Sequence, residues 1–129
     1  MEVYLIHAYD NENRGAYGME DWTIQESTLN EAIETAREMS YEVITSYQDI
    51  YGELRERAND YAREDEDVLT YDQYLNRRDN YLSQLIEEAI GYEVTKLDDR
   101  YTLKEYLSFL SMKDYDYETL KEDFGKEEY

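Results

Sequence analysis

The chain has no cysteine and no proline, and it contains a single histidine among its 129 residues. The absence of cysteine excludes disulfides, a thiolate nucleophile and cysteine-ligated zinc. The absence of proline is compatible with long, uninterrupted helices. The chain also lacks a Gly-rich phosphate loop, a nucleophile elbow and an HExxH zinc motif. We therefore expect no catalytic residue, no metal ligand and no cofactor.

Long apolar segments are missing as well. No stretch approaches the roughly 20 apolar residues that are needed to span a bilayer. The first ten residues, MEVYLIHAYD, have no basic region and too short an apolar run for a signal peptide. These features predict a cytoplasmic protein without a membrane partner.

Basic residues are scarce relative to acidic ones. The chain has 33 Asp and Glu against 13 Lys and Arg, which gives a formal net charge of −20. The excess of acids is spread along the whole chain, so it is not one acidic tail. Self-repulsion on this scale costs stability, whereas solubility requires only about 2–8 net charges. Direct binding of nucleic acid or an anionic membrane is thus disfavoured, and a basic protein surface is the favoured partner.

Tyrosine is the abundant aromatic residue, with 16 copies. The chain ends in KDYDYETLKEDFGKEEY, where tyrosines stand directly among carboxylates, and the same mixture recurs in NDYAREDEDVLTYDQYLNRRDNYLSQ. Tyrosine can pack its ring while its hydroxyl remains solvated or hydrogen-bonded. We predict a thin core with a tyrosine-rich margin.

The pattern of apolar residues predicts a single α+β domain over residues 1–129, with dominant amphipathic helices. Residues 2–9 alternate as a strand does and, with the short run DWTIQES, predict a β-hairpin over 1–27. Thr28 and Glu31 form a capping-box pattern that opens a helix over 28–64. Its apolar seam predicts one helix of about 35 residues or two nearly collinear ones, with Gly52 as the internal weak point.

The second half of the chain has three further start signals. Thr70 with Gln73 opens a second helix over 70–91, which is expected to end at Gly91. Residues 92–98 are either a third short strand or an extended link. Two C-terminal helices follow within 92–129, one opened by Thr102 and the other stopped by Gly125.

The helix predicted over 28–64 has a row of acids opposite its apolar seam. Successive acids are mostly three or four residues apart, so neighbours lie about 5–6 Å from each other on the helix surface. Like charges at this spacing destabilise a helix slightly, which suggests that the negative row itself is selected. On one straight helix the row would extend over about 50 Å. We name it the acid row, and its members are Glu31, Glu34, Glu38, Glu42, Asp49, Glu53, Glu56, Asp60 and Glu64.

A regular row of carboxylates is comparable with a phosphate backbone, although its charge density is about half that of one DNA strand. Tyrosine rings beside the acids would stand where bases stand beside phosphates. We therefore count further residues of the second helix and of the C-terminus as candidates for partner binding: Asp72, Asp79, Asp114, Tyr115, Asp116, Tyr117 and Glu118.

In composition, size and helical character the whole chain resembles the acidic DNA mimics encoded by phages, namely anti-restriction proteins and some anti-CRISPR proteins. The resemblance implies a non-enzymatic inhibitor that occupies the DNA-binding cleft of a host defence nuclease. It rests on no motif, so no functional residue is carried over. An adaptor that binds a basic partner without copying DNA is the alternative hypothesis.

Two more specific sites are weaker hypotheses. Asp10, Glu12, Gly15 and Asp21 follow the spacing of a calcium-binding loop, but Arg14 stands where an oxygen ligand belongs. His7 could perform acid–base or metal chemistry together with Asp10 and Glu12, which would make the protein a small enzyme or metal-binding protein. We favour a loop for the first site and a packed histidine for the second.

Overall fold

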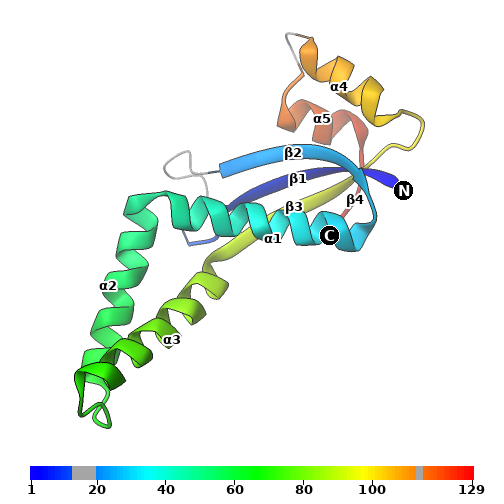
Figure 1. Ribbon diagram of the computed structural model, residues 1–129. Coiled ribbons are helices and arrows are strands. Elements are labelled where there is room, and N and C mark those ends of the chain that lie inside the picture. The colour runs from blue at the N-terminus through cyan, green and yellow to red at the C-terminus, as the bar shows by residue number, and fades with distance from the viewer. Residues whose placement is uncertain (13–19, 113–114) are drawn as a thin grey trace.

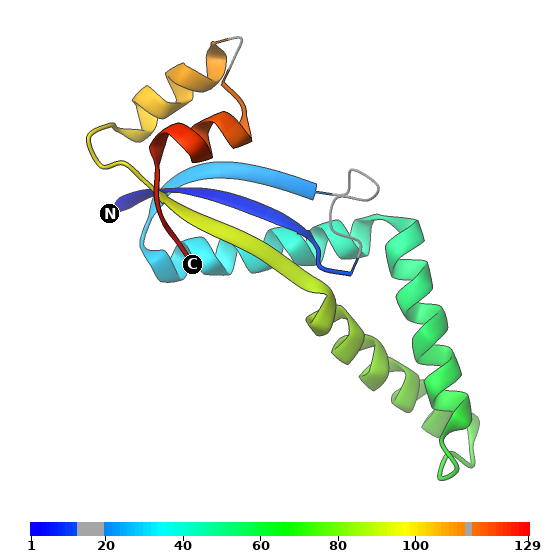
Figure 2. The same cartoon turned by 180° about the vertical axis from the view of Figure 1, so that it is seen from behind.

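The computed structural model describes residues 1–12, 20–112 and 115–129. Four strands form one antiparallel sheet that has helices on both faces, and two further helices project from it (Figures 1 and 2). The α+β class and the N-terminal hairpin expected from the sequence are thereby confirmed.

The sheet has the strand order β2-β1-β3-β4. β1 (Glu2–Asp10) pairs with β2 (Glu20–Ser27) on one side and with β3 (Ile90–Leu97) on the other. Residues 92–98 therefore belong mostly to a strand and not to an extended link. β4 (Gly125–Glu128) pairs with β3 at the far edge and was not predicted.

Both faces of β1 are buried because helices cover the sheet from two sides. α1 (Leu29–Ser46) packs its alanines against Tyr4 and Ile6. The opposite face, with Val3 and Leu5, packs against α4 (Leu103–Ser111) and α5 (Tyr117–Phe124). Alternate residues of β1 thus belong to two different parts of the core.

The segment expected to be helical over 28–64 forms two helices, which is the second of the two alternatives, but the helices are not collinear as that alternative predicted. α1 ends and α2 (Gln48–Glu64) begins at Tyr47, whose extended backbone (φ −96°, ψ 114°) interrupts the helix. The axes diverge steeply in Figure 1, so the helices are not collinear. Gly52 lies inside α2 and does not cause the break.

The break has a tertiary cause. The seam of α1 packs on the sheet, whereas the seam of α2, with Leu54 and Ala58, packs on Leu85 of α3 (Tyr71–Ala89). One straight helix could not reach both partners. α2 and α3 lie against each other and project away from the sheet, and we call this pair the arm (Figures 1 and 2).

The three threonine start signals are confirmed, but only two of them form the complete, reciprocal capping box. Thr70 and Thr102 form complete capping boxes with Gln73 and Glu105, while Thr28 accepts a hydrogen bond from the Glu31 backbone N–H at 3.3 Å. Each of these threonines is the N-cap of its helix.

The two predicted glycine stops have different outcomes. Gly125 directly follows α5, and a Cβ there would collide with the backbone carbonyl of Lys121. Gly91 does not end α3, which stops at Ala89; it lies in β3, where a Cβ would come within 2.5 Å of the Tyr9 ring. Gly91 therefore serves packing inside the sheet and not helix termination.

Candidate functional site

All nine members of the acid row are exposed. Asp60 lies 3.8 Å from Arg63, and the other eight make no ion pair with any residue in the described part of the chain. Most of the carboxylates in the row are therefore exposed, and no described side chain neutralises them.

Three other arginines pair with acids outside the row. Arg37 binds Glu87 of α3, and Arg57 Nη1 lies 2.7 Å from an oxygen of Glu12. Arg77 joins two acids of the α2–α3 loop, with distances of 2.7 Å to Asp65 and 2.8 Å to Asp67. The hydrogen bond from Arg77 lowers the pKa of Asp67. These cations organise the arm without neutralising the row.

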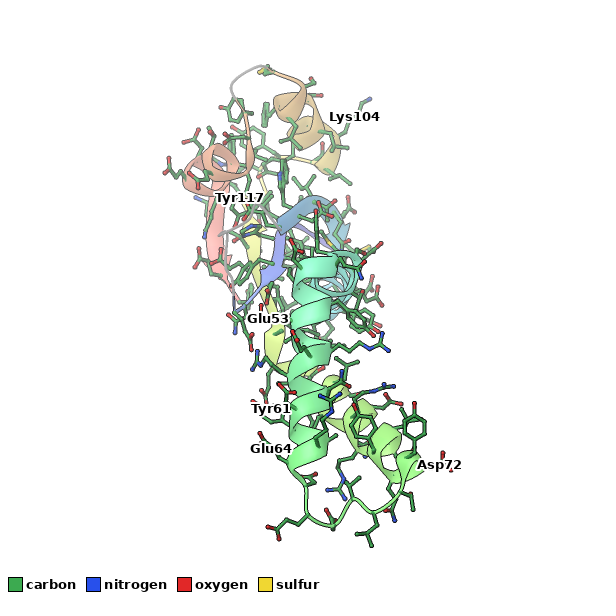
Figure 3. The ribbon with its side chains drawn as sticks, turned by 90° about the vertical axis from the view of Figure 1, so that its left-hand side faces the viewer. Glu53, Tyr61, Glu64, Asp72, Lys104 and Tyr117 are labelled. Atoms are coloured by element: carbon green, nitrogen blue, oxygen red, sulfur yellow. The ribbon has the colours of Figure 1, made fainter. Side chains whose placement is uncertain are left out.

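The turn at Tyr47 divides the acid row, so a single row of about 50 Å does not exist. From Glu31 to Glu42 on α1 the row extends over about 17 Å, and from Asp49 to Glu64 on α2 over about 23 Å. Figure 3 shows Glu53 and Glu64 following one another along α2, with Asp72 of α3 near the tip of the arm. The carboxylates thus form two shorter rows on helices of different direction.

The two candidates on α3 differ in their surroundings. Asp72 is exposed in the first turn of the helix, near the tip of the arm. Asp79 is also exposed but lies 3.1 Å from Arg78. Of these two, Asp72 is the carboxylate without an ion pair to a described residue.

The C-terminal candidates are largely engaged within the fold. Asp116 is the N-cap of α5 and accepts a hydrogen bond from the Thr119 backbone N–H at 3.0 Å, which lowers its pKa. The half-buried ring of Tyr115 packs on Phe109 and Phe124 at centroid distances of 5.7 and 6.0 Å. Glu118 is exposed, and Asp114 lies outside the described residues.

A pocket of about 770 Å³ lies on the sheet face opposite α1, beside α5 and β4. Tyr117 lies where α5 meets the sheet in Figure 3. Six glutamates and two lysines contribute to the lining, and most of these residues come from the end of the chain. The lining residues are His7, Glu20, Glu93, Thr95, Tyr117, Glu118, Lys121, Glu122, Gly125, Lys126, Glu127 and Glu128.

The buried side of this pocket contains His7. Its Nε2 lies 2.8 Å from an Oε of Glu20, and its ring packs on Tyr117 with 4.5 Å between centroids. His7 is 9% exposed, and its Nδ1 is buried without a hydrogen-bond partner in the described chain. The Oγ1 of Thr95, which is 1% exposed, is buried and unpartnered in the same way.

An ammonium group already occupies the outer part of the pocket. Lys121 Nζ lies 3.0 Å from Glu93 and 2.9 Å from Glu128, while the Tyr117 hydroxyl donates to the same Glu93 oxygen at 3.1 Å. The hydrogen bonds that Lys121 donates raise the pKa of the lysine, and the bond to Glu128 has a larger effect than the bond to Glu93. Burial raises the pKa of Tyr117 to about 12.

Asp10 and Glu12, which the sequence offers as partners of His7, do not lie beside it. Strand alternation places Asp10 on the other face of β1, where it is buried, and Glu12 pairs with Arg57. Glu20 comes from β2, Glu93 from β3 and Lys121 from α5. No local spacing connects these segments, so the pocket had no signal in the sequence beyond the position of His7 on an alternating strand.

The calcium-loop pattern is only partly visible, because Arg14 and Gly15 lie outside the described residues. Across residues 1–12, 20–112 and 115–129, no three His, Asp or Glu side chains are grouped closely enough to hold a metal ion.

Over the same residues, no helix combines the length and the apolar character needed to cross a membrane. No protein-family model, curated protein or solved structure matches the chain significantly.

Proposed function

We propose that the protein is a non-enzymatic inhibitor whose acid row occupies the basic, nucleic-acid-binding cleft of a host defence nuclease of the CRISPR or restriction type. The observation that carries this proposal is the unpaired state of the row. Eight of its nine exposed carboxylates lack an ion pair with a described residue, although Arg37 and Arg57 lie on the same two helices. Such a surface supplies the charges that the arginines and lysines of a phosphate-binding cleft would meet.

The physical cost of the row supports the same proposal. Like charges three or four residues apart destabilise a helix by a few tenths of a kcal/mol per pair. Glu34, Glu38 and Glu42 follow this spacing on α1, and Asp49, Glu53 and Glu56 do so on α2. An arrangement that costs folding energy is readily explained when a partner surface later compensates the charge.

The bend at Tyr47 limits the kind of mimicry. Two rows of about 17 and 23 Å on divergent helices do not follow one strand of a straight duplex. They fit a curved or two-sided cleft, in which the arm enters one part and α1 lines another. Exposed tyrosines accompany the acids on α1, at the turn between α1 and α2, and on the arm, and they supply rigid contact area. These tyrosines are Tyr41, Tyr47, Tyr61 and Tyr71.

A target of this kind acts on nucleic acid in the host cell, so we place the protein in the host cytoplasm.

The divided row also favours a second candidate function: an adaptor that binds a basic protein surface without copying DNA. The two functions differ in whether the target can hold nucleic acid and this protein at the same time.

Charge reversal tests the proposed use of the row. Lysine at Glu38, Glu42, Glu53 and Glu56 should leave the helical circular dichroism intact, because all four side chains are exposed. Against purified nucleases of restriction and CRISPR systems, the variant should lose at least about 100-fold in inhibitory potency, partly through slower association. The matched control changes four exposed acids outside the row to lysine: Glu26, Glu66, Asp99 and Asp123.

The control should retain most of the inhibitory potency, although its net charge equals that of the variant with lysines in the row. Equal losses in both variants would show that overall charge, and not the row, is responsible. With a target in hand, duplex DNA should raise the apparent dissociation constant in proportion to its concentration. A stable ternary complex of target, duplex and inhibitor would overturn mimicry and establish the adaptor.

A further inference from the structure

The pocket beside α5 is built to hold alkylammonium groups. Lys121 Nζ sits between two carboxylates at 2.9 and 3.0 Å and shares Glu93 with the Tyr117 hydroxyl. Charge-assisted hydrogen bonds of this length are the strong ones in proteins. The chain's own lysine therefore shows which chemical group the outer part of the pocket accepts.

The inner part of the pocket contains two further polar atoms that can accept a hydrogen bond and that have no hydrogen-bond donor in the described chain. Because His7 Nε2 faces the Glu20 carboxylate at 2.8 Å, this nitrogen carries the proton, and in the neutral ring Nδ1 is then an acceptor. Nδ1 and the hydroxyl of Thr95 are both buried and unpartnered within the described chain. A buried polar atom without a partner costs free energy, so a donor that reached either atom would be stabilised.

Charge and shape define the donor further. The pocket lining has six glutamates against two lysines, and Glu118 and Glu122 are exposed without an ion pair to a described residue. The rings of His7 and Tyr117 form an aromatic wall, and Trp22 lies 6.1 Å from Tyr117. Aromatic faces accommodate methylene groups and attract cations. This combination suits an elongated cation with several N–H donors.

We propose that this pocket binds a linear aliphatic polyamine, with its amines on the glutamates and its methylene groups along the aromatic wall. The terminal amine reaches toward His7 Nδ1 and Thr95 Oγ1. The site lies on the sheet face opposite α1, so its occupation does not depend on the proposed function of the acid row.

Two natural reporters make binding measurable at this site. His7 is the sole histidine and Trp22 the sole tryptophan of the chain. Titration with spermidine in about 150 mM salt, where the Debye length is about 8 Å, suppresses diffuse attraction to the acidic protein. We expect the imidazole resonances of His7 to shift and the Trp22 fluorescence to change along one saturable, 1:1 curve.

Paired variants separate the pocket from general acidity. Glu118→Gln with Glu122→Gln should weaken spermidine binding at least about tenfold. Glu38→Gln with Glu42→Gln removes the same charge on α1 and should change affinity less than about twofold. Thr95→Val removes the unpartnered hydroxyl and should weaken binding about fivefold without lowering the melting temperature, because a buried unpaired hydroxyl does not stabilise the fold.

Three outcomes would overturn the proposal. A titration without saturation would mean diffuse ion binding, and equal losses for the two glutamate pairs would mean the same. Unchanged affinity of Thr95→Val for spermidine, with the fold intact, would show that the ligand does not bind in the inner part of the pocket as proposed. Magnesium chloride at matched ionic strength serves as the control cation and should leave the His7 resonances in place.

Discussion

The acid row on α1 and α2 and the C-terminal segment from Tyr115 to Tyr129 are both rich in acids and tyrosine. In the row, eight of nine carboxylates have no ion pair with a described residue. In the C-terminal segment, Asp116 caps a helix, Glu128 holds Lys121, and Tyr115 packs in an aromatic cluster. The carboxylates of the row thus face solvent largely without ion pairs, whereas several residues of the C-terminal segment, whose acids are equally exposed, have defined partners within the fold.

The difference shows that composition does not decide the role of such a mixture. A tyrosine beside an acid belongs to the core wherever a second apolar layer lies within reach, as Phe109 and Phe124 do for Tyr115. α1 and α2 have apolar partners on one side, so their acids and many of their tyrosines remain in solvent. The exposed row is therefore the part of this mixture that is available for the proposed binding, whereas the aromatic residues Tyr115 and Phe124 pack within the fold.

The largest effect should come from exchanging one tyrosine in each region. Tyr115→Ala should reduce the free energy of unfolding by about 2 kcal/mol, because it removes a half-buried ring from the aromatic cluster. Tyr41→Ala, at a residue 52% exposed on α1, should change it by less than about 0.5 kcal/mol. Urea denaturation of both variants measures the contrast, and similar losses would contradict it.

Acid should destabilise the protein through paired carboxylates such as Asp98. Hydrogen bonds from the Arg100 side chain and backbone, with the charge of Lys126, lower the pKa of Asp98 from 3.8 to about 2. Since its folded-state pKa is lowered, its stabilising contribution is present above about pH 4 and is lost as the pH falls toward 2. Asp98→Asn should therefore lower the melting temperature at pH 7 and flatten this acid limb.

Asp49→Asn is the matched control, since Asp49 is exposed and has no ion pair with a described residue. Its melting temperature at pH 7 should change little, because the lost interaction of Asp49 with the N-terminus of α2 and the relieved repulsion from neighbouring acids oppose each other. Thermal melts from neutral pH to about pH 2 measure both variants. An identical decline in the two would show that the Asp98 ion pairs contribute nothing specific.

The smallest effect concerns salt. Raising salt from a low concentration should raise the melting temperature, because charges separated by more than about 10 Å are screened at 0.1 M. Glutamine at Glu38, Glu42, Glu53 and Glu56 should reduce this response, since part of the repulsion is then already removed. Glutamine at Glu26, Glu118, Glu122 and Glu127 provides the comparison outside the row. A melting temperature that falls with salt in the unmodified protein would contradict a fold limited by repulsion.

Features that depend on neighbours in the chain were predictable from the sequence. Thr70 and Thr102 begin their helices because a cap is completed within four residues. Residues 2–9 form a strand because their alternation matches the period of the pleat. The spacing of the acid row needs only the helical period, and its members are indeed all exposed.

Features that depend on distant segments were decided by the tertiary structure. The chain turns at Tyr47 because one part of the continuous apolar seam packs on the sheet and the other part packs on α3. The sequence at the turn contains no proline or glycine that would predict a break. Gly91 lies in a strand because the Tyr9 ring occupies the space of a side chain. His7 faces Glu20 and Tyr117 because β2 and α5 meet on one face of β1. Local energies set where elements begin, whereas long-range packing sets their direction and brings the pocket together.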